Sequence, residues 1–309
     1  MDPMLDFTSA YLSLKNEVLS ERVNELRQLM RGCILCPRKC RSDRLSGLVG
    51  TCQTGTQAIV SSYGPHFGEE APLVGRFGSG TIFLTHCNLK CIYCQNYDIS
   101  HLGHGSVVST EGLARMMLDL QRQGCHNINW VTPTHQLPVL VEALQEAARA
   151  GLRLPIVYNC GGYESLDSLR LLHGIIDIYM PDAKYADNAV GGLLSGVPDY
   201  WDRCREALAE MHRQVGDLVI DDTGVARRGL LVRHLVLPDG IAGTQAVMKF
   251  LARLSTNTYV NVMAQYQPQY RACEAGIIDR PLRSNEVSTA IETALEAGLS
   301  RLDQRYSRR

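Results

Sequence analysis

The sequence predicts an α/β fold: an open, partial (β/α)6 TIM-like barrel with a small N-terminal helical, Cys-rich extension. From residue 80 onward, short apolar runs alternate with longer segments of helical periodicity, which is the pattern of βα units and a parallel sheet. Six such units are present, too few for a closed eight-stranded barrel. We therefore expect the barrel to stay open.

The expected elements follow one another in a regular order. Apolar runs predict strands at residues 81–85, 128–131, 154–158, 175–179, 231–237 and 259–264. Helical periodicity predicts helices at residues 110–122, 137–150, 165–172, 201–215, 244–254 and 284–297. Functional residues of such folds lie at the C-terminal ends of the strands, so the segments that follow the strands are expected to form one site.

The N-terminal part of the chain has a different character. Residues 9–31 carry apolar side chains at helical spacing with charges between them, which predicts an amphipathic helix. A Cys-rich stretch follows that is too short and polar to build its own core. We expect two parts, an N-terminal helix with the Cys-rich segment in residues 1–70 and the partial barrel with its C-terminal helix in residues 71–309.

Composition excludes several classes of protein. A formal net charge of -1 argues against binding to nucleic acid through bulk electrostatics. No segment reaches the roughly 18 uninterrupted apolar residues that a membrane span requires, and the start of the chain lacks a secretory signal pattern. We therefore expect a cytoplasmic protein without nucleic-acid or membrane partners. In that reducing compartment, 11 Cys point to metal or cluster ligation rather than disulfides.

Three thiols follow the first expected strand directly. Cys87, Cys91 and Cys94 have the spacing C-x3-C-x2-C on one short loop. A [4Fe–4S] cluster normally takes four Cys ligands, so this loop can hold a cluster and leave one iron open for another molecule. The alternative is a structural zinc site closed by a fourth ligand such as His86 or His101.

A second Cys set lies in the N-terminal segment. Cys33, Cys36, Cys40 and Cys52 have the spacing C-x2-C-x3-C-x11-C. Four thiolates fit a tetrahedral zinc ion or an auxiliary [4Fe–4S] cluster equally well by count. Buried free thiols are the third alternative. The spacing does not choose among them.

Several motifs together resemble one family. They are Cys33-x2-Cys36-Pro-Arg-x-Cys40, Gly50-x-Cys52, His66-Phe-Gly-Glu-Glu70, Gly78-Ser-Gly-Thr-Ile-Phe83, Cys87-Asn-Leu-Lys-Cys91-x-Tyr-Cys94-Gln-Asn96, Asn127-Ile-Asn-x-Val-Thr-Pro-Thr-His135, Tyr179-x-Pro-Asp-Ala-Lys184 and Val232-Arg-His-Leu-Val-Leu-Pro238. The Cys87–Cys94 loop resembles radical S-adenosylmethionine (SAM) enzymes generally. Over nearly its full length the chain resembles the uncharacterised iron–sulfur homologues of pyruvate formate-lyase activating enzyme.

The resemblance implies a chemistry and its partners. SAM would chelate the open iron, and one electron from the reduced cluster would cleave it to methionine and a 5′-deoxyadenosyl radical that abstracts a hydrogen atom. The substrate would be a glycine of a partner protein, as for glycyl-radical activases, or another peptide or a small molecule. The electron donor would be a low-potential flavodoxin or ferredoxin. The competing class is a non-catalytic interaction protein with zinc at both Cys sets.

The resemblance also implies roles for individual residues. Asp182 and Lys184 match a D-x-K element that activases use on SAM, and a Lys ammonium can pair with the SAM carboxylate. Arg233 matches an activase arginine that reaches the same carboxylate, where a planar fork binds bidentately. Asn159 matches an Asn near the SAM ribose, and Tyr93 matches an aromatic residue next to the adenine.

One departure concerns the second expected strand. The family's Gly-Gly-Glu element, which receives the methionyl amino group, is replaced by Thr132-Pro-Thr-His135. The hydroxyls of Thr132 and Thr134 can accept a hydrogen bond, so SAM would be anchored there with less charge. His135 is the candidate catalytic residue, as a proton donor or substrate ligand.

Overall fold

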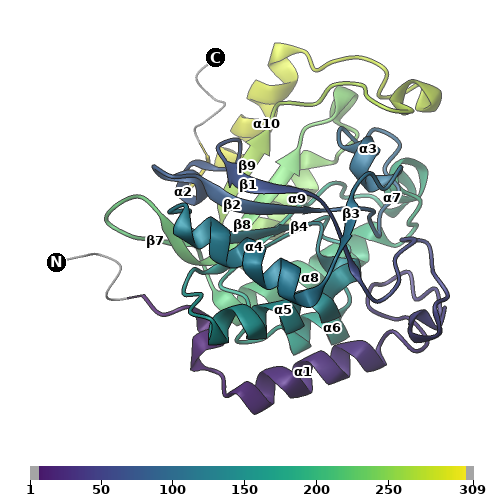
Figure 1. Cartoon of the computed structure of the whole chain (residues 1–309). Helices are drawn as coiled ribbons and strands as arrows, with labels where there is room; N and C mark the ends of the chain where they lie inside the picture. Colours follow the sequence, from purple (N-terminus) through teal and green to yellow (C-terminus); the bar gives the residue numbers. More distant parts are fainter. Residues whose placement is uncertain (1–6, 304–309) are drawn as a thin grey trace.

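The centre of the protein is one twisted sheet, whose strands run across the middle of Figure 1 with helices on either side. The computed structural model describes residues 7–303. Within them the strand order is β3-β1-β2-β4-β5-β6-β8-β7, with β9 paired to β8. The strands are β1 Ala58–His66, β2 Ser79–Leu84, β3 Ser106–Val108, β4 Ile128–Val131, β5 Ile156–Cys160, β6 Ile178–Pro181, β7 Val219–Ile220, β8 Ala226–Leu235 and β9 Tyr259–Met263.

The parallel part of this sheet is the predicted partial barrel. Strands β2, β4, β5, β6, β8 and β9 pair in parallel, in chain order. All five residues of β5 are buried, as expected for a central parallel strand that is covered on both faces. The six parallel strands in residues 7–303 and their intervening helices confirm the α/β fold class.

Helices cover the sheet, and the N-terminal helix packs on the outer side of this helical layer. They are α1 Asn16–Gln28, α2 Ala71–Val74, α3 Tyr97–Ser100, α4 Thr110–Arg122, α5 Leu137–Arg149, α6 Leu166–Leu171, α7 Asn188–Ser195, α8 Tyr200–Val215, α9 Thr244–Leu254 and α10 Ser284–Glu296. Helices α4, α5, α6 and α8 form a layer over the sheet, and α1 lies along α5 and α6 at the bottom of the view (Figure 1).

Local sequence explains where the helices begin. Helix α4 starts after Ser109, whose side chain accepts a hydrogen bond from the Gly112 N–H at 3.1 Å. The expected helices at residues 110–122 and 244–254 have the observed bounds of α4 and α9. The expected helix at residues 9–31 is divided into a 3-10 turn, Ala10–Ser13, and α1, because Leu14 and Lys15 are extended.

The sequence predicts no strand at the position of β1. Strand β1 pairs antiparallel with β2 and with β3, so it extends the barrel sheet by an edge hairpin. Much of β1 is not fully buried, and it contains Gly64 and Pro65, which weaken a strand signal. The expected boundary at residue 70 thus falls after a strand that already belongs to the sheet.

The N-terminal extension is bound to the bottom and side of the barrel. The Ala10 N–H donates to Asp177, and the Tyr11 hydroxyl donates to the Leu154 carbonyl. Buried Arg44 donates to the carbonyls of Gly55 and His135. The extension therefore shares the core of the barrel instead of forming its own.

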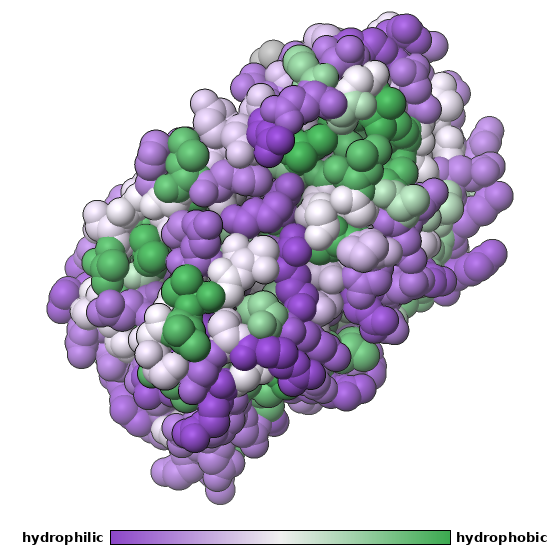
Figure 2. Space-filling model, turned by 90° about the vertical axis from the view of Figure 1, so that its right-hand side faces the viewer, coloured by the Kyte–Doolittle hydropathy of each residue, from purple (hydrophilic) through white to green (hydrophobic). Residues whose placement is uncertain are grey.

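Within residues 7–303, none of the helices combines the length and the apolar character that crossing a bilayer requires. The side that carries α3 and α7 in Figure 1 is largely hydrophilic, with separate apolar areas (Figure 2).

Candidate active site

A cavity of about 170 Å³ lies at the C-terminal ends of the parallel strands. Segments that follow β2, β4, β5 and β6, together with β8, contribute to its wall. Its lining includes Cys87, Cys91, Cys94, Thr132, Asn159, Asp182, Lys184 and Arg233. Eight of the residues expected to share a site thus come together from segments far apart in the sequence.

The three thiols lie on the loop between β2 and α3. Cys91 is buried, and Cys87 and Cys94 are partly exposed. The Lys90 N–H donates to the Ser195 carbonyl at 3.2 Å, and the Ile92 N–H donates to the Leu194 carbonyl at 2.9 Å. The end of α7 therefore holds the loop in place on both sides of Cys91.

Burial makes Cys87 and Cys91 hard to ionise by themselves. Burial, with the nearby Cys91, raises the pKa of Cys87 to about 12. Burial also raises the pKa of Cys91, and the ammonium of Lys184 opposes that rise. A metal or cluster would supply the positive charge that stabilises thiolates at neutral pH.

The donor set fits a [4Fe–4S] cluster better than a single ion. A zinc ion needs its ligands about 2.0 to 2.3 Å from one point. In residues 7–303, no group of three or more His, Cys, Asp or Glu side chains is arranged to hold one metal ion. The thiolates of a cluster each bind a different iron, so three separated thiols on one cavity wall suit it.

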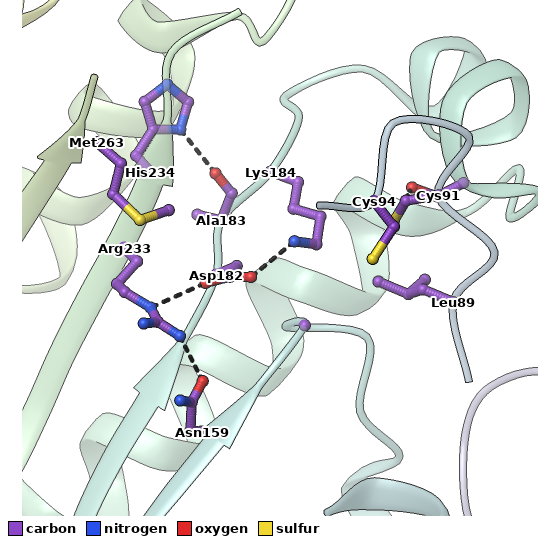
Figure 3. Close-up of polar contacts among 12 residues, drawn as sticks. Leu89, Cys91, Cys94, Asn159, Asp182, Ala183, Lys184, Arg233, His234 and Met263 are labelled. Atoms are coloured by element: carbon purple, nitrogen blue, oxygen red, sulfur yellow. Dashed lines mark hydrogen bonds and ion pairs between the residues drawn. The ribbon is translucent and has the colours of Figure 1, made fainter. Parts of the chain in front are cut away.

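A largely buried charge network crosses the cavity from the loop that carries Cys87, Cys91 and Cys94 (the cluster loop) to β8. Lys184 Nζ lies 2.6 Å from Asp182 Oδ2, and Arg233 Nε lies 3.1 Å from Asp182 Oδ1. A guanidinium nitrogen of Arg233 also donates to Asn159 Oδ1. Figure 3 shows this row, with Lys184 between Asp182 and the loop of Cys91 and Cys94.

The backbone explains why these charges meet. Asp182 and Arg233 form an isolated parallel bridge directly after β6, and the Ala183 N–H donates to the Arg233 carbonyl at 2.7 Å. Gly162 lies against the Asp182 carbonyl with a φ of 75°, and a Cβ there would be 2.2 Å from that oxygen. Only glycine lets the segment after β5 approach so closely.

The network keeps its members charged despite burial. Burial would raise the pKa of Asp182, but Lys184 and Arg233 hold it below its usual value. Burial would lower the pKa of Lys184, but the Asp182 carboxylate raises it well above the usual lysine value. Both groups are therefore ionised at neutral pH.

Two further carboxylates contact Arg233 from outside the predicted site. Glu69 Oε2 lies 3.4 Å from Arg233 Nη1, and Glu70 Oε1 lies 3.9 Å from Arg233 Nε. Burial raises the pKa of Glu70, whose Oε1 also accepts from Asn261 at 2.7 Å. These residues follow β1, and their adjacency in the His66–Glu70 motif was the signal that could have placed them.

Three predicted residues lie elsewhere. Thr134 and His135 are buried and do not line the cavity. Thr134 donates to Glu164 at 2.8 Å, and His135 Nε2 lies 2.8 Å from the Thr85 carbonyl oxygen. Burial lowers the pKa of His135 to about 3, so it is neutral and holds the loop after β2. Its position does not support the expected role as proton donor or substrate ligand.

Tyr93 is the third of these residues. It is buried, it is not part of the cavity lining, and its ring packs edge-on against Tyr185 and Tyr266. Its hydroxyl lies 2.5 Å from the Tyr185 hydroxyl. This position does not support contact with an adenine in the cavity.

The N-terminal Cys set lies apart from the cavity lining. Cys33, Cys36 and Cys52 are buried, whereas Cys40 is exposed. The segment joins the cluster loop through Arg38, which donates to the carbonyls of Asn88, Ser195 and Gly196. These hydrogen bonds connect the segment of the N-terminal Cys set to the loop of Cys87, Cys91 and Cys94. No sequence pattern predicted this contact.

Comparison with known proteins identifies similar chains. A family model described as the Radical SAM superfamily matches residues 81–228, from β2 into β8. An uncharacterised protein of Methanocaldococcus jannaschii is 30% identical over 291 residues, covering 91% of this chain and 79% of that protein. The solved structure of Streptococcus suis SuiB bound to the precursor peptide SuiA matches with a TM-score of 0.45 and 11% identity, over 71% of this chain. This chain spans 46% of that SuiB chain.

Proposed function

Because this chain belongs to the radical SAM superfamily, we propose that Cys87, Cys91 and Cys94 hold a [4Fe–4S] cluster and that SAM binds beside it in the cavity. The observation that supports this most strongly is that the three thiols and the charge network line the same cavity. When bound, the reduced cluster supplies the electron that cleaves SAM to methionine and a 5′-deoxyadenosyl radical, which abstracts a hydrogen atom from the substrate.

The charge network would bind the methionyl end of SAM. Lys184 carries its positive charge into the cavity, which suits a carboxylate, and Asp182 suits an ammonium group. Arg233 already donates to Asp182 and Asn159, so we assign it to holding these two acceptors as well as to the carboxylate. Because the charges are paired before SAM arrives, little reorganisation is needed on binding.

Two polar side chains complete the proposed SAM site. The Asn159 amide suits the ribose hydroxyls, and the Thr132 hydroxyl can accept a hydrogen bond from the amino group. Thr132 has a φ of 60°, an uncommon conformation for a β-branched residue, which the Thr132 N–H bond to the Asn159 carbonyl at 2.8 Å helps to hold.

Iron analysis and SAM cleavage test this proposal together. Protein purified without oxygen should be brown and contain iron and sulfide at about four per chain for one cluster. Reduction with dithionite in the presence of SAM should yield 5′-deoxyadenosine. Cys91→Ala should abolish that product, whereas Cys125→Ala, a buried cysteine outside the cavity lining, should retain it. Colourless protein with zinc alone would contradict the proposal.

We further propose that the substrate is a glycine in a partner protein and that a flavodoxin or ferredoxin supplies the electron. The support is the Asp182-Ala-Lys184 element, which resembles that of the activases and whose Asp182 and Lys184 line the cavity here. A partner that carries deuterated glycine should transfer deuterium into 5′-deoxyadenosine and gain a glycyl radical signal. Deuterium transfer from a different peptide or a small molecule, and none from glycine, would replace the activase assignment.

We also propose that the N-terminal Cys set binds a second cluster or, if its thiols draw together from the separated positions that they have in residues 7–303, a zinc ion. The segment between α1 and β1 contains only a three-residue 3-10 turn in the described structure, yet three of its four thiols are buried. A bound metal would stabilise such a segment. Metal analysis of a Cys87→Ala, Cys91→Ala double variant isolates this set, with about one zinc or about four iron expected. Protein without metal would show free thiols.

A further inference from the structure

Each thiol of the cluster loop lies next to a hydrogen-bond donor. The Leu89 N–H donates to Cys87 Sγ at 3.3 Å. Ser195 Oγ lies 2.9 Å from Cys91 Sγ, and Ser100 Oγ lies 3.1 Å from Cys94 Sγ. Ser195 is the last residue of α7, more than a hundred positions after Cys91, so only the tertiary structure brings this hydroxyl to the sulfur.

Behind Ser195 the hydroxyl contacts continue into the core. Ser195 Oγ lies 2.9 Å from the Tyr185 hydroxyl, which lies 2.5 Å from the Tyr93 hydroxyl. Ser195 and Tyr185 are fully buried, and Tyr93 is 4% exposed. Three hydroxyl groups therefore form a water-shielded chain that ends at the sulfur of Cys91.

If Cys91 binds iron, the hydrogen bonds along this row of hydroxyl groups must all donate in one direction, toward the sulfur. A thiolate bound to iron has no proton, so Ser195 must donate to Cys91 Sγ. The Ser195 oxygen is then free to accept from Tyr185, and the Tyr185 oxygen is free to accept from Tyr93. Each bond polarises the next, and the effect is strongest where water is excluded, so the donor at the sulfur is strengthened by those behind it.

The backbone of Ser195 is fixed from two sides. Its carbonyl accepts from the Lys90 N–H at 3.2 Å and from Arg38 Nη2 at 3.2 Å. Lys90 directly precedes Cys91, and Arg38 also donates to the Asn88 carbonyl beside Cys87. The same contacts therefore fix both the Ser195 hydroxyl and the cluster loop, so the distance between them is maintained.

We propose that Ser195, supported by Tyr185 and Tyr93, is a positioning residue that raises the reduction potential of the cluster, and that Ser100 does the same at Cys94. This inference rests on the proposed function, since it requires the cluster. Reduction adds negative charge to the cluster, and a hydrogen bond to a ligating sulfur stabilises that added charge. The buried row of hydroxyl groups would therefore make the cluster easier to reduce, although none of these hydroxyls would contact SAM.

The test is a redox titration of the cluster-loaded protein, followed by electron paramagnetic resonance of the reduced cluster. Ser195→Ala should shift the midpoint to a lower potential, and Ser100→Ala should shift it in the same direction. Tyr185→Phe keeps the serine donor and breaks the chain behind it, so its shift should be smaller. Ser195→Thr retains the hydroxyl, so its midpoint potential should lie closer to that of the natural protein than the midpoint of Ser195→Ala does.

A matched control, another buried serine, is available at the N-terminal end of β2, the strand that precedes the cluster loop. Ser79 is fully buried and donates to Asn127 at the start of β2, so Ser79→Ala removes a buried serine hydroxyl far along the strand from the thiol loop. Its midpoint should equal that of the natural protein. A uniform shift in Ser79→Ala and Ser195→Ala would mean a general effect of lost packing, and would overturn the inference.

The outcomes separate this inference from the proposed function. If the natural protein loads no cluster, both fail. If it loads a cluster and cleaves SAM, but Ser195→Ala and Ser100→Ala leave the midpoint unchanged, the function stands and the inference is overturned. If Ser195→Ala fails to load, Tyr185→Phe and Ser100→Ala still decide, because each must shift the midpoint downward for the inference to hold.

Discussion

At the scale of single residues, the cavity depends on ionised groups that are almost removed from water. Asp182 pairs with Lys184 and Arg233 at once, and all three side chains are less than a fifth exposed. Removing one partner of a buried pair leaves an uncompensated charge, which costs more than the loss of a surface pair. The pairing therefore constrains substitution at each position.

We predict that Lys184→Met weakens SAM binding on the order of 10- to 100-fold, because a charge-assisted hydrogen bond contributes about 1.5 to 3 kcal/mol. Calorimetric titration of cluster-loaded protein with SAM measures the effect. Lys249→Met, which changes an exposed lysine of α9, is the control and should bind normally. Equal affinity in the two variants would exclude Lys184 from the SAM site.

Glu164 is a buried acid outside the proposed chemistry. Burial raises its pKa from 4.5 to about 7, although Thr134, Tyr158 and Cys160 form hydrogen bonds that oppose the rise. Below pH of about 4.5 the folded and unfolded states are both protonated. As pH rises, the unfolded chain releases this proton first, so the folded state loses stability until about pH 7.

This shift predicts a loss on the order of 3 kcal/mol in the free energy of unfolding between about pH 4.5 and 7. Denaturant unfolding across that range measures it, and Glu164→Gln should flatten the dependence. Asp177 has a pKa that burial also raises to about 7, and it is present in both proteins. The difference between the two curves therefore reports Glu164, and identical curves would contradict the prediction.

At the scale of elements, Arg38 joins the N-terminal Cys-rich segment to the cluster loop and to the end of α7. Its three donated hydrogen bonds reach carbonyls on both of those elements. The segment was expected as a small Cys-rich extension of the barrel, and the structure shows that it also contacts the loop that carries the proposed ligands. The reason is the fold, which brings the segment beside the strand ends.

We predict that Arg38→Met accelerates loss of iron from the cluster-loaded protein several-fold, because carbonyls beside Cys87 and Cys91 lose their donor. The time course of absorbance loss in air, together with released iron, measures this. Arg31→Met, an exposed arginine after α1, is the control. An unchanged rate in Arg38→Met would show that the loop is held sufficiently by α7 alone.

At the scale of the whole molecule, Asp177 ties the N-terminal part to the bottom of the barrel. Its carboxylate accepts from the N–H groups of Ala10 and Ile156 at 2.8 and 3.0 Å. It precedes β6, while Ile156 begins β5 and Ala10 begins the N-terminal turn. Three segments of the fold therefore meet at one fully buried carboxylate.

Asp177→Ala should lower the free energy of unfolding on the order of 2 to 5 kcal/mol, because two buried N–H groups lose their acceptor. Denaturant titration measures the change. Asp167→Ala, at an exposed position of α6, should stay within about 0.5 kcal/mol of the natural protein. Comparable small losses in both variants would mean that other contacts hold the N-terminal part.

The sequence by itself determined the repeating part of the molecule. Periodicity is a local property, so the helices α4, α5, α8, α9 and α10 and most of the parallel strands could be predicted within three residues, whereas β8 begins five residues before its predicted start. The thiol spacing and the polar segments after the strands also lie within short stretches. Parallel strands align their C-terminal ends, so the amino-acid sequence alone was enough to expect Cys87, Asn159, Asp182 and Lys184 at one site.

Only the tertiary structure decided which side chains turn toward the cavity and which support it. Thr132 and Thr134 are two positions apart, yet the first lines the cavity and the second binds Glu164. Tyr93 lies among the thiols in sequence, but packing turns its ring into the core. Ser195 and Arg38 reach the loop from distant segments. Such contacts depend on long-range packing, which leaves no periodic signal in the sequence.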